Sequence, residues 1–256
     1  MWTRREILSG GALALSFASG GRCACAADVQ APHSKGCLLA DEDVDAIYPP
    51  GTDTRAFING NEPIIPRSGD RDFDLALAQT LAKLAQAFGV VPGFAYYDDY
   101  DSLNAYATPR VRLFRADGTV LMGINFLQKL RAGREAPEVA VAGVCSHEFG
   151  HIIQFRHQLI PVVNAGQPTI KRSELQADYF AGYFAGLRKR ERPSYPAAVV
   201  AMTQYDYGDN NFADESHHGT RQERGAAVVR GFEAAFRDKR GLAEAIQEST
   251  NYVLTL

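Results

Sequence analysis

The residues best suited to chemistry form one short run, His147-Glu148-Phe149-Gly150-His151. On a helix, residues four positions apart lie on the same face, with their Cβ atoms about 6 Å apart. His147 and His151 can therefore bind one zinc ion together. Glu148 lies beside them and can accept a proton from a water molecule on the metal. The run predicts the core of a zinc-dependent hydrolase.

A catalytic zinc site needs a third protein ligand and keeps one position for water. Glu174, 23 positions after His151, opens the next predicted helix and is the candidate ligand. Asp178 follows on the same face of that helix. Because a metal-bound histidine usually donates its other ring N–H to a carboxylate or carbonyl, we expect Asp178 to orient a histidine, His147 in our interpretation. The alternative is that both acids belong to a solvated helix face.

The histidines need a buried helix to hold them. Pro137 precedes a strongly apolar stretch, which predicts one continuous helix over 138–157 that starts at about Pro137. Gly150 within this helix lowers helix propensity, and its small size can allow another backbone to approach. Cys145 lies in the apolar part, so we favour a free buried thiol over a disulfide with Cys37.

The remaining pattern predicts an α+β fold with a small mixed sheet. Apolar residues recur at helical spacing from Asp72 to Phe88, and Gly89 then marks a helix end. Strands are expected at 93–98 and 102–107, and 111–115 with 119–124 should form a hairpin around Ala116-Asp117-Gly118. Helices are predicted at 171–190, 195–205, 221–237 and 242–248, with loops at 160–169 and 206–219.

The first 26 residues have the layout of a cleavable export signal. Arg4-Arg5 precedes a weakly apolar segment, and Ala24-Cys25-Ala26 fits a cleavage site. The adjacent arginines resemble a twin-arginine signal, which implies a periplasmic or secreted protein; a Sec signal is the alternative. Residues 27–70 show no periodicity and are expected to be extended, with one short strand near 55–59. Residues 71–256 are expected to form the catalytic domain.

Charge and hydropathy limit the partners. Removal of residues 1–26 takes away three arginines and one glutamate, so the net charge moves from −3 to −5. This mild acidity argues against nucleic acid or an anionic membrane surface as a partner. No apolar run reaches the roughly 18–20 residues that a membrane span requires. We therefore expect a peptide or protein substrate.

The metal motifs resemble those of a known family. The 147–151 run, together with Glu174-Leu175-Gln176-Ala177-Asp178, resembles the gluzincin metallopeptidases. The segment 174–182 and the later His218-Gly219-Thr220-Arg221-Gln222-Glu223-Arg224 are similar to bacterial neutral zinc metallopeptidases. Segment 104–107, followed by 117–120 and Gly123, is similar to the strand region of M48 peptidases. The resemblance covers about 102–230, is specific at the metal motifs and loose elsewhere.

The resemblance implies a zincin-like fold, in which a small mixed sheet packs on the active-site helix and a mostly helical part follows. Strand 119–124 is our candidate for the sheet edge that lines the cleft, where an extended peptide can add as a strand. The resemblance favours His218 over His217 as a residue that stabilises the oxyanion. Tyr179 and Tyr183 are alternatives for that role.

We therefore expect a zinc-dependent peptidase with Glu148 as the general base. Two alternatives stay open. One is a scaffold or binding protein of the same fold that holds zinc without catalysis, and the other is a zinc hydrolase of a non-peptide amide. Whether residues 27–70 act as a propeptide over the cleft is also open.

Overall fold

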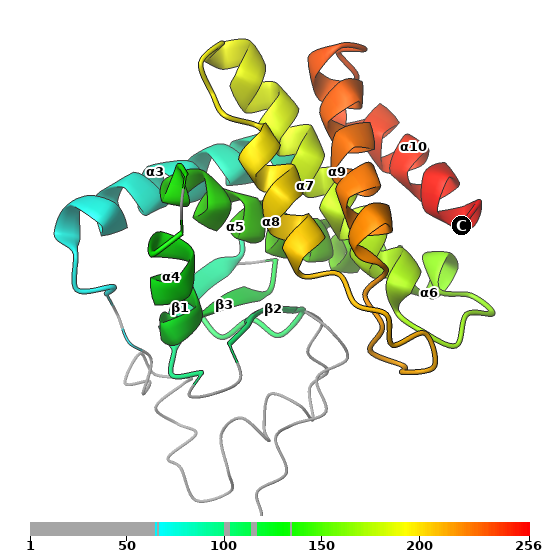
Figure 1. Cartoon of the computed structure of the whole chain (residues 1–256), viewed down its shortest axis with the longest axis horizontal. Helices are drawn as coiled ribbons and strands as arrows, with labels where there is room; N and C mark the ends of the chain where they lie inside the picture. Colours follow the sequence, from blue (N-terminus) through cyan, green and yellow to red (C-terminus); the bar gives the residue numbers. More distant parts are fainter. Residues whose placement is uncertain (1–64, 66, 100–102, 114–116, 134) are drawn as a thin grey trace, which may run out of the picture. The chain divides into compact units, whose positions relative to one another are not determined.

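The computed structural model describes residues 65, 67–99, 103–113, 117–133 and 135–256 (Figure 1). These residues form a three-stranded mixed sheet and eight helices, so the expectation of a small mixed sheet followed by a mostly helical part is confirmed. No helix among them is long and apolar enough to cross a membrane. The predicted export signal, the strand near 55–59 and Cys37 lie outside the described residues.

The helix predicted from Asp72 is α3 (Arg71–Phe88). Its first turn is capped by Asp70, whose carboxylate accepts a hydrogen bond from the Phe73 backbone N–H at 3.0 Å. It ends at Gly89, where a φ of 63° is a left-handed conformation that glycine adopts without strain. The buried side chains of α3 are Leu77, Leu84 and Phe88.

The sheet contains β1 (Gly93–Tyr97), β2 (Ala105–Thr108) and β3 (Thr119–Gly123) in the order β1-β3-β2. β3 pairs with β1 in parallel and with β2 in antiparallel orientation. The predicted hairpin between 111–115 and 119–124 is therefore wrong. The antiparallel partner of β3 is β2, so Asp117 does not connect two paired strands. Its carboxylate accepts hydrogen bonds from the Val91 backbone N–H and the Arg156 guanidinium.

The expectation that 119–124 is the edge strand is also wrong. All five residues of β3 are buried, and β3 has a partner strand on each side. A strand buried on both faces reads as a continuous apolar run, which is typical of the centre of a sheet. β2 pairs only with β3 among the described strands, so β2 is the edge nearest to the residues Leu103 and Asn104.

A helix that the sequence did not predict follows β3 directly. It is α4 (Ile124–Arg131), and its N-cap residue, Gly123, has no side chain to cap it. Asp99 from the end of β1 caps it instead, accepting from the backbone N–H groups of Asn125 at 2.8 Å and Phe126 at 2.9 Å. Because this cap comes from a distant part of the chain, no local signal marks the helix start.

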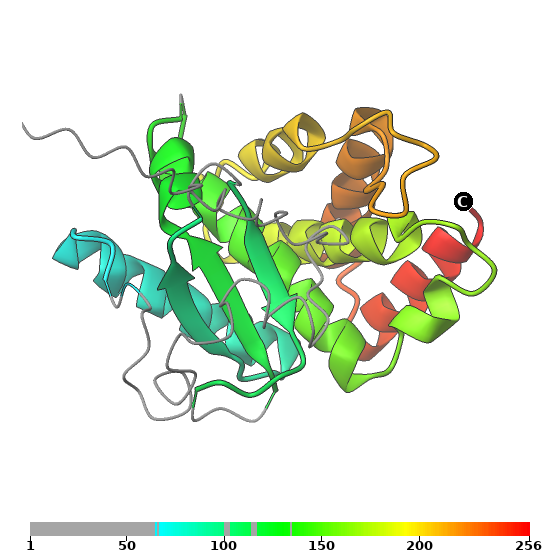
Figure 2. The same cartoon turned by 90° about the horizontal axis from the view of Figure 1, so that it is seen from below.

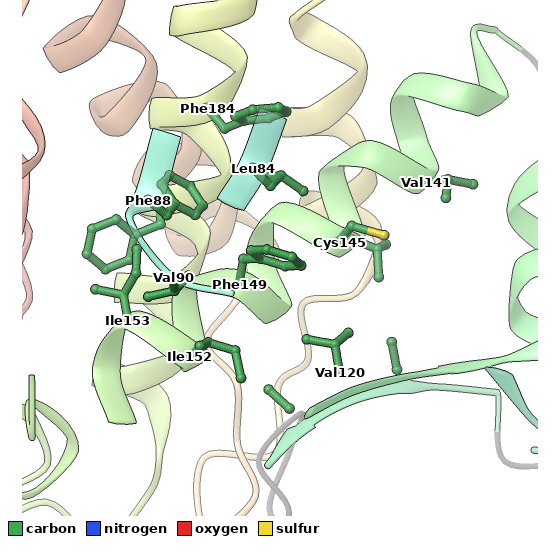
Figure 3. Packing of buried hydrophobic residues seen from close by; sticks show 14 of the residues in the cluster. Leu84, Phe88, Val90, Val120, Val141, Cys145, Phe149, Ile152, Ile153 and Phe184 are labelled. Atoms are coloured by element: carbon green, nitrogen blue, oxygen red, sulfur yellow. The ribbon is translucent and has the colours of Figure 1, made fainter. Parts of the chain in front are cut away.

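The predicted central helix is α5 (Pro137–Arg156), and it is buried along most of its length. One side of α5 packs on the sheet and on α3: Figure 3 shows Phe149 between Val120 of β3 and Phe88 of α3, in the same buried cluster as Cys145. Cys145 is a free, buried thiol, as favoured from the sequence. α5 therefore lies between the sheet and the C-terminal helices.

α7 (Lys171–Glu191) and α8 (Ala198–Asp206) cover the other side of α5, and α9 (Arg221–Phe236) and α10 (Leu242–Leu254) pack on α7 (Figures 1 and 2). α7 and α9 approach each other closely at Gly231, where an added Cβ would lie 1.8 Å from the Tyr179 carbonyl oxygen. Within the expected loop 160–169 there is one short helix, α6 (Ile160–Val163), and the last helix, α10, is longer than predicted.

Candidate metal centre

The structure brings His147, His151 and Glu174 together. The two histidines lie one turn apart on α5, and their Nε2 atoms are 3.1 Å from each other. The Glu174 carboxylate, from the first turn of α7, lies 3.3 Å from the His147 Nε2 and 3.5 Å from the His151 Nε2. All three side chains are at most 2% exposed. Their ligand atoms lie within 4.8 Å of one another, so this buried group can hold a metal ion.

Close contact between two helices makes this convergence possible. At Gly150, between the histidines, an added Cβ would lie 3.0 Å from the Cα atom of Ala177 on α7. A larger side chain there would separate the helices and move Glu174 away from the histidines. Gly150 thus allows a second backbone to approach, as its small size suggested.

The outer nitrogen of each imidazole already has a partner. The Nδ1 atom of His147 lies 2.8 Å from an Asp178 oxygen, and the Nδ1 atom of His151 lies 2.8 Å from the Gln154 side-chain oxygen. Because both partners are acceptors, each Nδ1 carries a proton, and in the neutral ring each Nε2 then presents a lone pair inward.

Glu174 adds negative charge at the same point. Neither of its carboxylate oxygens has a hydrogen-bond partner among the described residues. Burial opposes ionisation of Glu174, whereas positive charge on the imidazoles of His151 and His147, when these rings are protonated, lowers the pKa of Glu174 below the usual range. Two lone pairs and a carboxylate that face one another in a buried space repel, and a bound cation would remove that repulsion.

His147 is supported by a buried ion pair. Arg224 of α9 donates to both oxygens of Asp178, from Nε at 2.7 Å and from a terminal nitrogen at 2.8 Å. Burial alone would raise the pKa of Asp178, but the Arg224 guanidinium holds it below its usual range. Arg224 also donates to the Gln204 side-chain oxygen at 3.1 Å. The carboxylate that faces His147 therefore stays ionised.

His151 has a neutral environment instead. Burial lowers the pKa of its imidazole to about 4, despite the opposing effect of the Glu174 carboxylate. At neutral pH the ring is therefore uncharged, which is the form that coordinates a metal ion.

A cavity of about 140 Å³ lies next to His147. Glu148, His147 and His218 contribute to its wall. The rest of the wall consists of Leu103, Asn104, Phe126, Val144, Gln204, Tyr207 and Arg224. A small reactive group can thus reach Glu148 and the metal-binding group from one side.

The two adjacent histidines of the 206–219 loop differ in their positions. His218 lines the cavity, and its Nδ1 atom lies 3.3 Å from an oxygen of Asp209. His217 is buried outside the cavity wall, with its Nδ1 atom 2.5 Å from the other oxygen of Asp209. Burial would raise the pKa of Asp209, but the bonds from His217 and His218 lower it to about 2.

The proposed tyrosines do not reach the cavity. Tyr183 donates its hydroxyl hydrogen to the Arg240 carbonyl oxygen at 2.8 Å, and Tyr179 packs against Phe180 in the core. Neither lines the cavity, so the structure does not support their assignment to the oxyanion. Tyr207, at the end of α8, is the tyrosine in the cavity wall.

Three residues at this site were not singled out from the sequence: Arg224, Gln154 and Tyr207. A signal for Arg224 was present, because it shares a helix face with Ala227, Val228 and Gly231, all buried. A charged residue on an apolar face needs a buried partner. Gln154 follows His151 by three positions, which also places it on the same face.

Comparison of the chain with protein-family models, with curated proteins and with solved structures finds no match. The function of the site is therefore inferred from its geometry and from the sequence motifs that form it.

Proposed function

We propose that this protein is a zinc-dependent peptidase with a zincin-like fold. His147, His151 and Glu174 are the proposed zinc ligands, and Glu148 is the general base. The observation that carries the proposal is the buried group of two inward-facing Nε2 atoms and one carboxylate beside a cavity that Glu148 lines. Two imidazoles and one carboxylate with an open position are the typical ligand set of a catalytic zinc ion.

In the proposed reaction, a bound zinc ion supplies Lewis acidity, which lowers the pKa of a coordinated water towards about 7 and polarises the substrate carbonyl. The Glu148 carboxylate accepts the proton of the attacking water and then delivers it to the leaving amine nitrogen. Asp178 and Gln154 keep the proton of each histidine on Nδ1. The buried surroundings of His151 and Glu174 exclude bulk water from the ligands.

His218 is the proposed oxyanion-stabilising residue. It lines the cavity with Glu148, and its Nδ1 atom faces Asp209, which is ionised at neutral pH. In the protonated form of His218, the Nε2–H group donates a hydrogen bond to the developing oxyanion. His217 is outside the cavity wall, which supports His218 as the choice.

The substrate is proposed to be an extended peptide that adds to the edge of β2. This strand has its other edge paired with β3, and the residues just before it, Leu103 and Asn104, line the cavity. A peptide paired with β2 would pass the cavity mouth, and its backbone would be held by strand-type hydrogen bonds.

Export is part of the proposal. The arginine pair Arg4-Arg5 and the site Ala24-Cys25-Ala26 support a cleaved twin-arginine signal and a periplasmic or secreted location. Replacement of both arginines by lysine should prevent export, and mass spectrometry of the exported wild-type chain should show residue 27 as its first residue. An exported chain that keeps residues 1–26 contradicts the proposal.

The function is tested with the purified protein and the variant Glu148→Gln. We expect about one zinc ion per chain in both, chelator-sensitive cleavage of a peptide library by the wild type, and a loss of about 10²- to 10⁴-fold in the variant. Glu138→Gln, an exposed glutamate on the same helix, is the matched control and should cleave normally.

Each alternative function has its own outcome in this assay. Zinc binding without cleavage of peptides or small amides supports a scaffold protein, and cleavage of small amides alone supports a non-peptide amide hydrolase. Turnover by Glu148→Gln at the wild-type rate contradicts the role of Glu148.

A further inference from the structure

A chain of buried side-chain hydrogen bonds connects His151 to the last helix. The Gln154 side-chain nitrogen donates to the Ser173 carbonyl oxygen at 2.7 Å and to the Gln176 side-chain oxygen at 3.1 Å. The Gln176 nitrogen donates in turn to the Ser249 and Thr250 hydroxyl oxygens of α10, at 3.1 Å and 2.9 Å. We call Gln154, Gln176, Ser249 and Thr250 the amide network.

The amide network has only one consistent direction. The Ser173 carbonyl can only accept, so Gln154 must turn its NH₂ group towards Ser173 and its oxygen towards His151. Both α10 hydroxyls donate to the Ile246 carbonyl oxygen, at 2.9 Å and 2.8 Å, and therefore accept from the Gln176 NH₂ group. Backbone carbonyls at both ends thus define which atoms donate.

This direction determines the tautomer of His151. Because the Gln154 oxygen accepts, the proton of the ring must lie on Nδ1, and the Nε2 lone pair must point at Glu174 and His147. In the opposite tautomer, the lone pair of Nδ1 would face the lone pairs of the Gln154 oxygen. The rings and amides are fully buried, so water cannot compensate for such a mismatch.

We propose that Gln154 and Gln176 are positioning residues, which hold His151 in its metal-binding tautomer and make α10 part of the metal centre. The proposal rests on the proposed function in that the bound ligand is zinc. It extends that function because Gln176, Ser249 and Thr250 are not among the proposed metal ligands and do not line the cavity. The C-terminal helix thereby acts on metal affinity from outside the site.

The test measures zinc affinity of the full-length protein by competition with a chromophoric chelator at pH 7. Loss of a hydrogen-bond partner behind a metal ligand typically weakens metal binding 10- to 100-fold, so we expect about tenfold weaker binding in Gln154→Met. Gln176→Met is one step further from His151 and should weaken binding about threefold. Both substitutions keep the volume of the side chain and remove only its polar atoms.

A second measurement reads the tautomer directly. In ¹⁵N NMR spectra of the metal-free protein, His151 should be protonated on Nδ1 in the wild type and should become a mixture of tautomers in Gln154→Met. Gln154→Glu restores an acceptor to Nδ1, so His151 should return to the Nδ1–H form, while the second carboxylate oxygen faces the Ser173 carbonyl and should lower stability. Zinc affinity should still rise above that of Gln154→Met. A role in packing alone would not produce this rescue.

Val253→Ala is the matched control. Val253 is fully buried on α10 and lies outside the amide network, so its truncation should lower the melting temperature without changing zinc affinity. Ser249→Ala serves as a second variant at the far end if Gln176→Met does not fold. Its zinc binding should weaken in the same direction.

The proposal is overturned if His151 keeps one tautomer in Gln154→Met, or if zinc affinity stays within about twofold of wild type in the Gln154 and Gln176 variants. It is also overturned if Val253→Ala weakens zinc binding as much as Gln176→Met does. If the wild type binds no zinc, the proposed function fails, while the tautomer comparison on the metal-free protein still decides the role of the amide network.

Discussion

The two histidines of the candidate metal centre lie in chemically different surroundings. His147 faces an ion pair, Asp178 with Arg224 of α9, whereas His151 faces the uncharged amide network that ends on α10. Both arrangements leave the proton on Nδ1 and the lone pair on Nε2. The two histidines thus have the same orientation for different reasons. The stability that the ion pair and the amide network contribute should depend differently on charge and pH.

The largest effect should follow from removal of Arg224. Arg224→Met leaves Asp178 as a buried charge without its main partner, so we expect about 3–5 kcal/mol of destabilisation. Urea unfolding of the metal-free protein measures it. The corresponding change in the amide network behind His151, Gln176→Met, should lower the free energy of unfolding by about 1–3 kcal/mol. Equal losses in the two variants would contradict the distinction between the ion pair and the amide network.

As the pH falls, the stability contributed by neutral His151 should be lost first. The pKa of His151 is lowered to about 4 in the folded chain, so the unfolded chain binds more protons between about pH 6.5 and pH 4. Stability of the metal-free protein should fall over this window as pH falls, by on the order of 3 kcal/mol at about 1.4 kcal/mol per pH unit.

The stability contributed by the ion pair of Asp178 and Arg224 should be lost at lower pH. The pKa of Asp178 is lowered below 3.8, so its contribution is complete above that value and is lost only as the pH falls further. Urea unfolding at a series of pH values resolves the two windows. His157→Gln, which changes an exposed histidine, should leave the profile unchanged. A profile that is flat from pH 6.5 to 4 contradicts the burial of neutral His151.

Gly150→Ala should weaken the contacts of both histidines with α7. The added methyl group would lie 3.0 Å from the Ala177 Cα atom, and the α7 backbone can move only by shifting Glu174, Gln176 and Asp178. We expect a cost of about 1–3 kcal/mol from overpacking, partly offset by roughly 1 kcal/mol of helix propensity. Zinc titration and urea unfolding should both report losses, and an unchanged zinc affinity would show that α5 and α7 can separate freely.

The smallest effect is expected at Tyr183, which ties α7 to the residues before α10 away from the metal. Tyr183→Phe removes the hydrogen bond to the Arg240 carbonyl, at a cost of about 1 kcal/mol. Zinc affinity and peptide cleavage should be unchanged. A loss of cleavage would indicate that Tyr183 stabilises the oxyanion. A loss of zinc affinity would indicate that contacts of α7 with the segment before α10 also affect zinc binding.

Local patterns in the sequence were sufficient for the elements that carry the ligands. The prolines, glycines and apolar spacing placed α3, α5, α7 and α9 within a few residues of their observed bounds. The failures share a cause. The start of α4 depends on Asp99, and the central place of β3 depends on pairing with β1 across intervening chain. Neither contact can be recognised from the residues that are adjacent in the sequence.

By itself, the sequence determined the spacing of His147, Glu148 and His151, because the helical repeat is a local property of the backbone. The sequence also identified Glu174 and Asp178 as candidate site residues, since both occupy one face of the next helix. Only the tertiary structure decided what stands behind each histidine. Arg224 and α10 reach the site through packing of helices that are distant along the chain, and side-chain types alone do not specify which distant groups will meet.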